Sequence, residues 1–254
     1  MNAGLELKTE VVMQTVKVSR LFGGLAANKE VDIAIRRGQV HVVLGPNGAG
    51  KSTLINLLSG DLACSSGSVL YHGRDITGLA PDARSRIGIG RSYQKTNIFP
   101  GFTVLENCRL AAQSRAPRAG ALFSRALAHA PYLEMAYQSL ADVGLSAYAH
   151  RQAGDLSHGE QRQLELAIVL CTQPEVLLLD EPLAGMGAEE SARMIELLRT
   201  LVPSHAILMV EHDMDAVFSI ADVITVMVNG SVLVTGSPEE IRTSAEVQRA
   251  YFGH

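Results

Sequence analysis

Apolar residues recur along this chain with two periods, one typical of β-strands and one typical of α-helices. Short runs that predict strands lie at residues 39–44, 67–71, 87–94, 176–179 and 206–210. The run at 176–179 is apolar throughout, as expected of a strand that is buried on both faces of a parallel sheet. Residues 11–18 and 31–35 alternate between apolar and polar positions, and we expect them to form an antiparallel layer beside that sheet.

Near the C-terminus, the pattern predicts a hairpin and then a helix. Residues 223–228 and 232–234 flank Asn229-Gly230, a pair that favours a two-residue type I′ turn. Residues 237–240, Ser-Pro-Glu-Glu, supply an N-cap, a first-turn proline and a capping glutamate for the last helix.

Helical spacing dominates the middle of the chain. A short helix over 52–58 stops before Gly60, and an amphipathic one includes 194–201. Between them, Thr103 and Glu106 form a capping box that begins a helix, residues 115–125 interrupt the pattern, and a second helix ends at Gly144. A third helix follows residues 156–160 and runs to about 172. Because residues 103–171 show no strand pattern, we interpret them as a helical insertion in a βα protein.

Composition narrows the class of protein. The 254 residues are 47% hydrophobic and 19% charged with a net charge of −4, which describes an ordinary globular protein and not a nucleic-acid-binding or disordered one. No apolar run approaches the roughly 20 residues that span a bilayer, and residues 1–10 lack the core of a signal peptide. The three cysteines have no Cys-x-x-Cys spacing, so we expect buried thiols in a reducing cytosol.

A glycine-rich segment joins the predicted strand 39–44 to the predicted helix 52–58. It reads Gly45-Pro46-Asn47-Gly48-Ala49-Gly50-Lys51-Ser52-Thr53 and matches the P-loop pattern G-x-x-x-x-G-K-[ST]. Its glycines let backbone N–H groups turn toward an anion, and the helix N-terminus adds partial positive charge. Lys51 supplies a full charge for the β- and γ-phosphates of ATP, and the Ser52 hydroxyl is placed to ligate Mg²⁺. A plain turn with a surface lysine is the alternative, but every fixed position and both flanking elements match the nucleotide-binding pattern.

Polar residues follow two of the predicted buried strands. Asp180 and Glu181 end the strand 176–179, and His212 follows the strand 206–210. Ligand chemistry in open α/β sheets gathers at the carboxyl ends of strands. Taken alone, a histidine such as His212 at a strand end is more often structural, and Gln94 is equally compatible with an ordinary loop role. Phe22 alone favours core packing over stacking on a nucleotide base.

Five motifs taken in order resemble those of the ABC-transporter ATPases. They are the P-loop at 45–53, the Q-loop glutamine Gln94, the signature Leu156-Ser157-His158-Gly159-Glu160-Gln161-Arg162, the Walker B end Asp180-Glu181-Pro182, and the switch histidine His212. The resemblance covers nearly the whole chain. It implies an α/β P-loop core over 11–94 and 173–254, a helical subdomain over about 95–172 and a flanking antiparallel β layer, all in one domain over 1–254.

The resemblance also implies a role for each single residue. Asp180 holds Mg²⁺ through water, and Glu181 is the general base that orients the attacking water. Gln94 touches both Mg²⁺ and that water, His212 contacts the γ-phosphate, and Phe22 stacks on adenine.

The signature implies a second ATPase subunit, because in the family it binds the ATP held by a partner in a head-to-tail dimer. Ser157 and Gly159 then reach the partner's γ-phosphate, with Glu160 beside the nucleotide. Three positions depart from the usual pattern: His158 replaces a glycine, Glu160 replaces a glutamine, and Gly187 stands where many relatives have aspartate.

Several stretches are similar to the ATPase subunits of branched-chain amino acid importers. They lie at 21–25, 91–94, 172–175, 180–186, 210–214 and 249–253. The resemblance implies a Mg-dependent ATPase that sits peripherally on the cytoplasmic face of the inner membrane, docks on permease subunits through residues 94–102, and does not touch the cargo. Alternatives within the family are lipopolysaccharide export and urea import. A soluble ABC protein acting on DNA or ribosomes is disfavoured by the acidic charge balance.

Overall fold

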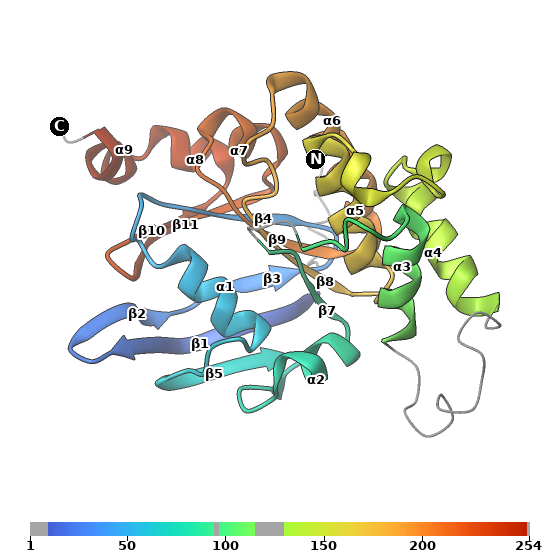
Figure 1. Cartoon of the computed structure of the whole chain (residues 1–254). Helices are drawn as coiled ribbons and strands as arrows, with labels where there is room; N and C mark the ends of the chain where they lie inside the picture. The colour runs from blue at the N-terminus through green and yellow to red at the C-terminus, as the bar shows by residue number, and fades with distance from the viewer. Residues whose placement is uncertain (1–9, 94–96, 115–129, 253–254) are drawn as a thin grey trace, which may run out of the picture.

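The chain folds into two β-sheets with helices between and around them (Figure 1). The structure is a computed structural model that describes residues 10–93, 97–114 and 130–252. Within these ranges no helix combines the length and the apolar character needed to cross a membrane.

The larger sheet has six strands in the order β11-β10-β4-β9-β8-β7. Its members are β4 (Val40–Leu44), β7 (Ile89–Arg91), β8 (Val176–Asp180), β9 (Ala206–Val210), β10 (Val223–Val228) and β11 (Ser231–Gly236). All neighbouring pairs are parallel except β10 and β11, which form the predicted antiparallel hairpin. Asn229 and Gly230 have φ angles of 48° and 80°, as a type I′ turn requires. Because the strands are parallel, the ends of β4, β8 and β9 meet at one edge of the sheet.

The smaller sheet is the predicted antiparallel layer. It contains β1 (Val11–Phe22), β2 (Leu25–Val31), β3 (Ala34–Arg36), β5 (Ser66–Tyr71) and β6 (Arg74–Asp75). The single strand predicted at 31–35 is wrong, since β2 ends at Val31 and β3 begins at Ala34. The Thr15 hydroxyl occupies this break, since it donates to the Val31 carbonyl at 2.8 Å and accepts from the Ile33 N–H at 2.9 Å.

Helices cover both faces of the larger sheet. Helix α1 (Lys51–Ser59) lies between the two sheets and buries its apolar side chains there, among them Leu54 and Leu58. The opposite face packs against α5 (His158–Leu170), α6 (Ala188–Leu201), α7 (Met214–Ile220) and α8 (Pro238–Thr243). Strand β4 serves both cores, since Val42 packs toward α5–α8 and Val43 packs toward α1. This two-sided burial explains its nearly continuous apolar sequence.

Three helices, α3 (Val104–Gln113), α4 (Ala130–Asp142) and α5, pack against one another at one end of the molecule (Figure 1). The capping boxes predicted at Thr103 and at Ser237 are both formed, and Ser157 forms a further one with Glu160 at the start of α5. Helices α2 (Pro81–Arg86), α7 and α9 (Ala245–Phe252) were not predicted. Short 3-10 turns lie at η1 (Ser146–Tyr148), η2 (Ala153–Asp155) and η3 (Val202–Ser204). The exact division into core and helical subdomain stays a prediction.

Candidate nucleotide-binding site

The P-loop joins the buried end of β4 to the start of α1, as the sequence predicts. Gly50 precedes the helix in the left-handed conformation, with φ of 97°, and no side chain caps the helix. A Cβ atom at Gly50 would lie 2.4 Å from the Ala27 carbonyl oxygen, and one at Gly45 would lie 2.4 Å from the Met227 carbonyl oxygen. Only glycine fits at these two positions. Because no side chain caps α1, the first backbone N–H groups of the helix remain available to bind an anion.

Neighbouring strands hold the loop in place. The Gly230 N–H in the β10–β11 turn donates to the Ala49 carbonyl at 3.0 Å, and the Lys29 N–H donates to the Gly230 carbonyl at 2.8 Å. The buried Asn28 side chain donates to the Gly50 carbonyl at 3.2 Å. The sequence analysis missed this support, because nothing local to β2 indicates which loop it contacts.

Lys51 lies across the loop and not in solvent. Its side chain is buried, and its Nζ donates to the carbonyls of Gly45 at 2.6 Å and Pro46 at 3.1 Å. Burial lowers the pKa of the Lys51 ammonium, while the carboxylates of Glu181 and Asp180 act in the opposite direction. The fold thus places the P-loop lysine close enough to the two predicted acidic residues for their charges to interact. Pro46, Asn47, Gly48 and Ser52 are exposed at its mouth.

Asp180 ends β8 and is only 4% exposed. Burial raises the pKa of its carboxyl group, the Arg91 guanidinium opposes that shift, Glu181 adds to it and Lys51 opposes it. Its Oδ1 atom is buried and has no hydrogen-bond partner among the described residues. A buried carboxylate oxygen without a partner suits a hydrated Mg²⁺ ion. Within the described ranges no three His, Cys, Asp or Glu side chains are grouped to hold a metal ion.

Glu181 and His212 approach each other at the sheet edge. Glu181 has φ of 51°, a strained value for a glutamate, and its N–H donates to the Val210 carbonyl at 3.0 Å. His212 is mostly exposed, and its Nδ1 lies 3.9 Å from Glu181 Oε1 and 3.8 Å from Glu211 Oε2. The structure therefore brings together two residues that are 31 positions apart in the sequence.

Glu211 is a residue of this site to which the sequence analysis gave no role. It is 1% exposed, and burial raises the pKa of its carboxyl group. It accepts hydrogen bonds from the Leu183 N–H at 2.9 Å and the His212 N–H at 3.3 Å, and so links the segment after β8 to the segment after β9. An acidic residue directly after a buried apolar strand was the available signal.

Two further predicted residues are placed less completely. Phe22 ends β1 at the hairpin, is 47% exposed, and carries the Arg20 guanidinium over its ring at 4.7 Å from the centroid. One face of an exposed ring thus has a cation, and the adenine-stacking role stays a prediction. Gln94 lies outside the described residues.

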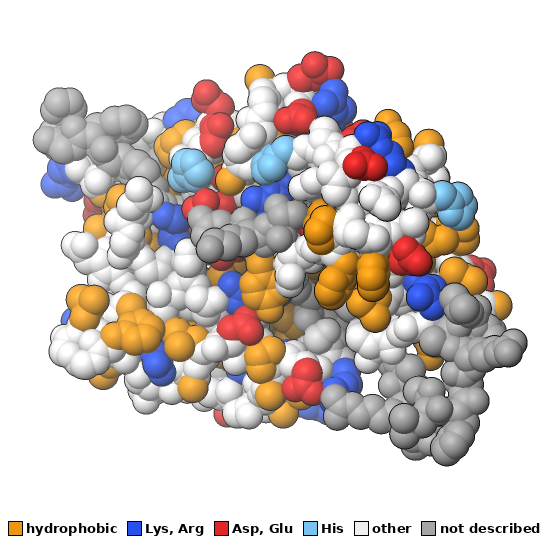
Figure 2. Space-filling view, in the orientation of Figure 1, with side chains coloured by type: hydrophobic (Ala, Val, Ile, Leu, Met, Phe, Trp, Pro, Cys, Tyr) orange, Lys and Arg blue, Asp and Glu red, His pale blue; other side chains and the backbone are white. Residues whose placement is uncertain are grey.

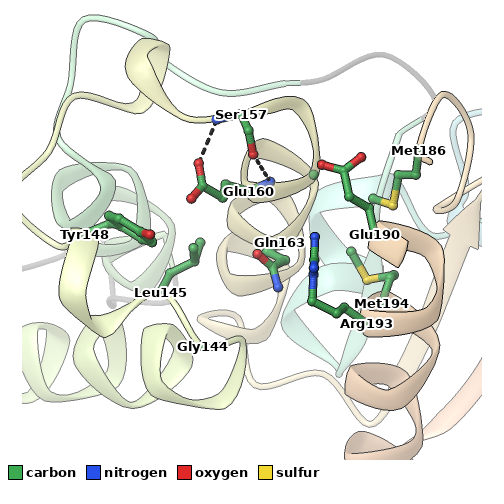
Figure 3. Close-up of a pocket in the computed structure, with 11 residues that line it drawn as sticks. Gly144, Leu145, Tyr148, Ser157, Glu160, Gln163, Met186, Glu190, Arg193 and Met194 are labelled. Carbon is green, nitrogen blue, oxygen red and sulfur yellow. Dashed lines mark hydrogen bonds between the residues drawn. The ribbon is translucent and has the colours of Figure 1, made fainter. Parts of the chain in front are cut away.

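The signature residues form the N-terminus of α5. The Ser157 N–H donates to Glu160 Oε2 at 2.7 Å, and the Glu160 N–H donates to Ser157 Oγ at 3.3 Å (Figure 3). The hydrogen bond from the Ser157 backbone is the main cause that lowers the pKa of Glu160. Glu160 therefore caps its own helix, and its place beside a partner's nucleotide stays a prediction. These residues and Glu190, Arg193 and Met194 of α6 line a cavity of about 260 Å³ (Figure 3). A Cβ at Gly159 would lie 2.7 Å from Glu190 Oε1, so α5 and α6 approach closely there.

The family described as ABC transporter matches residues 28–184, which is more than half of the chain. The chain belongs to the ABC transporter family. Among curated members, it is 40% identical over 241 residues to the high-affinity branched-chain amino acid transport ATP-binding protein LivG of Salmonella typhimurium (strain LT2), covering 91% of this chain and 94% of that protein. It is 36% identical to BraF, the protein of the same description from Pseudomonas aeruginosa, covering 95% of this chain and 98% of that protein.

Solved ABC structures confirm the predicted fold. The structure of a nucleotide-free ATP-binding cassette from an ABC transporter superposes on the present structure with a TM-score of 0.85 at 30% identity. The match covers 96% of the present chain and all of the cassette. The ADP conformation of the cassette MJ1267 superposes with a TM-score of 0.82 at 30% identity, covering 97% and 100%.

Proposed function

We propose that this ABC-family chain binds and hydrolyses Mg-ATP and thereby powers a permease that imports branched-chain amino acids. The observation that supports hydrolysis most directly is the joint placement of Lys51, Asp180, Glu181 and His212 around the P-loop. The proposed cargo rests on the names of LivG and BraF, which match over more than nine-tenths of this chain.

Each residue has a role in this proposal. The N–H groups of 45–53 and the Lys51 ammonium bind the β- and γ-phosphates, and Phe22 stacks on adenine. Ser52, Asp180 through water, and Gln94 hold Mg²⁺, which when bound neutralises charge on the phosphates. Glu181 orients the attacking water and accepts its proton, and His212 contacts the γ-phosphate. The protein supplies positioning and charge stabilisation with no covalent intermediate.

The proposal includes two kinds of protein partner. A second, identical or related ATPase subunit pairs head-to-tail, so that Ser157, Gly159 and Glu160 lie at the partner's nucleotide. Permease subunits dock on the 94–102 loop and hold the chain on the cytoplasmic face of the inner membrane. The described part of this loop supports that surface, because Phe99 and Phe102 are exposed and stack with ring centroids 5.3 Å apart. We expect no contact with cargo.

A nucleic-acid partner is not part of the proposal. The net charge is −4, and acidic and basic side chains are interspersed over the face shown in Figure 2. A basic patch or stripe is the usual electrostatic footprint of nucleic-acid binding.

Hydrolysis is tested on the purified protein with two substitutions. Lys51→Ala removes a charge from the triphosphate, so ATP binding should weaken and hydrolysis should stop while the fold persists. Glu181→Gln keeps the shape and removes the base, so ATP should still bind while turnover falls by roughly a hundredfold or more. Calorimetry measures binding, and phosphate release measures turnover. Hydrolysis by Glu181→Gln within a few-fold of wild type contradicts the assignment of the base.

Cargo is tested in cells whose chromosomal copy carries Glu181→Gln. Uptake of labelled leucine, isoleucine and valine should fall to background and return with a wild-type copy. Urea uptake, measured in parallel, should not change. Loss of urea uptake with normal leucine uptake would replace the proposed cargo and leave the ATPase proposal standing.

A further inference from the structure

Arg91, at the end of β7, contacts three separate parts of the molecule. Its side chain is 9% exposed, and its Nη1 donates to Ser59 Oγ at 2.7 Å and pairs with Asp61 Oδ2. Its Nη2 lies 3.7 Å from Asp180 Oδ2. Its Cζ lies 4.7 Å from the centroid of the Tyr93 ring, a distance typical of cation–π contacts.

The residues that Arg91 contacts belong to elements that form the candidate site. Ser59 ends α1, the helix that begins at the P-loop, and Asp61 comes two residues later, after the C-cap Gly60. Asp180 is the proposed Mg²⁺ ligand, and Tyr93 is the last described residue before Gln94. One rigid, planar guanidinium thus links the P-loop helix, the Walker B end and the entry to the Q-loop. A lysine cannot reproduce this, because its ammonium is a single point on a flexible stem.

We propose that Arg91 is a positioning residue for ATP hydrolysis. It orients Asp180 through Oδ2, while Oδ1 has no hydrogen-bond partner among the described residues. It also sets the path of the chain at Tyr93 as that chain enters the Q-loop. Asp61 anchors the guanidinium from the far end of α1. This inference rests on the proposed ATPase function, and Arg91 acts through its neighbours without touching nucleotide.

The site tolerates the substitutions that test it. Arg91 lines a cavity of about 200 Å³ together with Ser59, Asp61 and Tyr93. Arg91→Met therefore fits without overpacking and removes both the charge and the fork. Arg91→Lys keeps the charge alone. Arg86→Met is the matched control, because Arg86 forms a surface ion pair with Asp82 on α2.

The test separates binding from turnover in the purified full chain. For Arg91→Met we expect ATP affinity within about threefold of wild type and kcat lower by roughly tenfold to a hundredfold, since small displacements of catalytic groups cost rate more than affinity. Arg91→Lys should recover part of the rate, and Arg86→Met should match wild type. Thermal melting identifies variants that have merely lost their fold.

A double-mutant cycle with Asp61 tests the mechanism. Asp61 also accepts a hydrogen bond from Ser59 Oγ at 2.7 Å, a contact that Arg91→Met leaves in place. Asp61→Asn should lower kcat without lowering ATP affinity, and adding it to Arg91→Met should cost little more, because Asp61 acts on Asp180 through the guanidinium. The proposal would be overturned if the losses of kcat in Asp61→Asn and Arg91→Met were additive, or if Arg91→Met hydrolysed ATP at the wild-type rate. It would also be overturned if both Arg91 variants lost ATP affinity and melting temperature together. If the wild-type chain itself fails to hydrolyse ATP, the proposed function and this inference fall together.

Discussion

At the scale of single residues, two charged side chains of the candidate site, Lys51 and Glu211, are buried and hydrogen-bonded. Lys51 donates to two loop carbonyls, and Glu211 accepts two backbone N–H groups. Burying a charge is costly unless it is paired or hydrogen-bonded. These groups are therefore held in defined positions before any nucleotide arrives, which is what catalysis by positioning requires.

Another buried residue, His41 on β4, makes stability depend on pH. Burial lowers the pKa of His41, and a hydrogen bond with the Ala34 carbonyl opposes that shift. Because the folded-state pKa lies below the unfolded value of about 6.5, the folded state binds fewer protons. The stability contributed by neutral His41 is complete above the unfolded pKa and is lost as the pH falls toward the folded pKa.

We therefore expect the free energy of unfolding of the wild-type protein to fall as the pH is lowered from 7.5 to 5. The free energy of unfolding of His41→Gln should fall by less over the same range. The difference is at most about 1.4 kcal/mol per pH unit. Urea unfolding at both pH values measures it, and exposed His150→Gln is the control that should behave as wild type. Equal pH dependence in wild type and His41→Gln would exclude His41 as the cause.

At the scale of elements, α6 begins without a side-chain cap. Its N-cap is Gly187, with φ of −71° and ψ of 165°, a conformation open to any residue. No atom lies within 4 Å of a Cβ built there. Aspartate at this position would accept hydrogen bonds from the first turn and place negative charge at the helix N-terminus.

Gly187→Asp should raise the free energy of unfolding by about 0.5 kcal/mol. Gly187→Ala should lower it, because alanine is a poor N-cap. Denaturant unfolding of the two variants against wild type provides the comparison. An increase in the free energy of unfolding in both variants would show that backbone entropy, not capping, governs this helix end.

At the scale of the whole molecule, the proposed dimer makes Ser157 act on a partner's nucleotide. Within the described ranges, the Ser157 hydroxyl accepts a hydrogen bond from the Glu160 N–H of its own helix. Ser157→Arg should therefore leave ATP binding to the isolated subunit nearly unchanged and abolish hydrolysis, because the bulky side chain blocks closure. Calorimetry and phosphate release distinguish this from Lys51→Ala, which loses binding.

Ser157→Ala is the matched control, since it removes the same cap, worth about 1 kcal/mol, without adding bulk. Mixing Ser157→Arg with Lys51→Ala places both intact residues in one composite site, and some hydrolysis should return if one intact site is sufficient. Loss of ATP binding by monomeric Ser157→Arg would assign Ser157 to its own nucleotide and exclude the head-to-tail arrangement.

Features encoded within a few neighbouring residues were predictable from the sequence. The P-loop, the capping boxes at Thr103 and Ser237, and the Asn229-Gly230 turn each depend on local backbone conformation and adjacent side chains. Buried parallel strands such as β8 and β9 were predictable for the same reason, because burial on both faces demands an uninterrupted apolar run.

Other features depend on contacts between distant segments, and only the tertiary structure decided them. Strand β2 has the unremarkable sequence Leu-Ala-Ala-Asn-Lys-Glu-Val and forms by pairing with β1. Thr15 of the neighbouring strand occupies the break in the strand predicted at 31–35. Arg91 meets Asp180 across 89 positions, and Glu211 meets Leu183 across 28. A sequence pattern reports the period and burial of one segment, but a side chain's partner depends on which strands the fold places side by side.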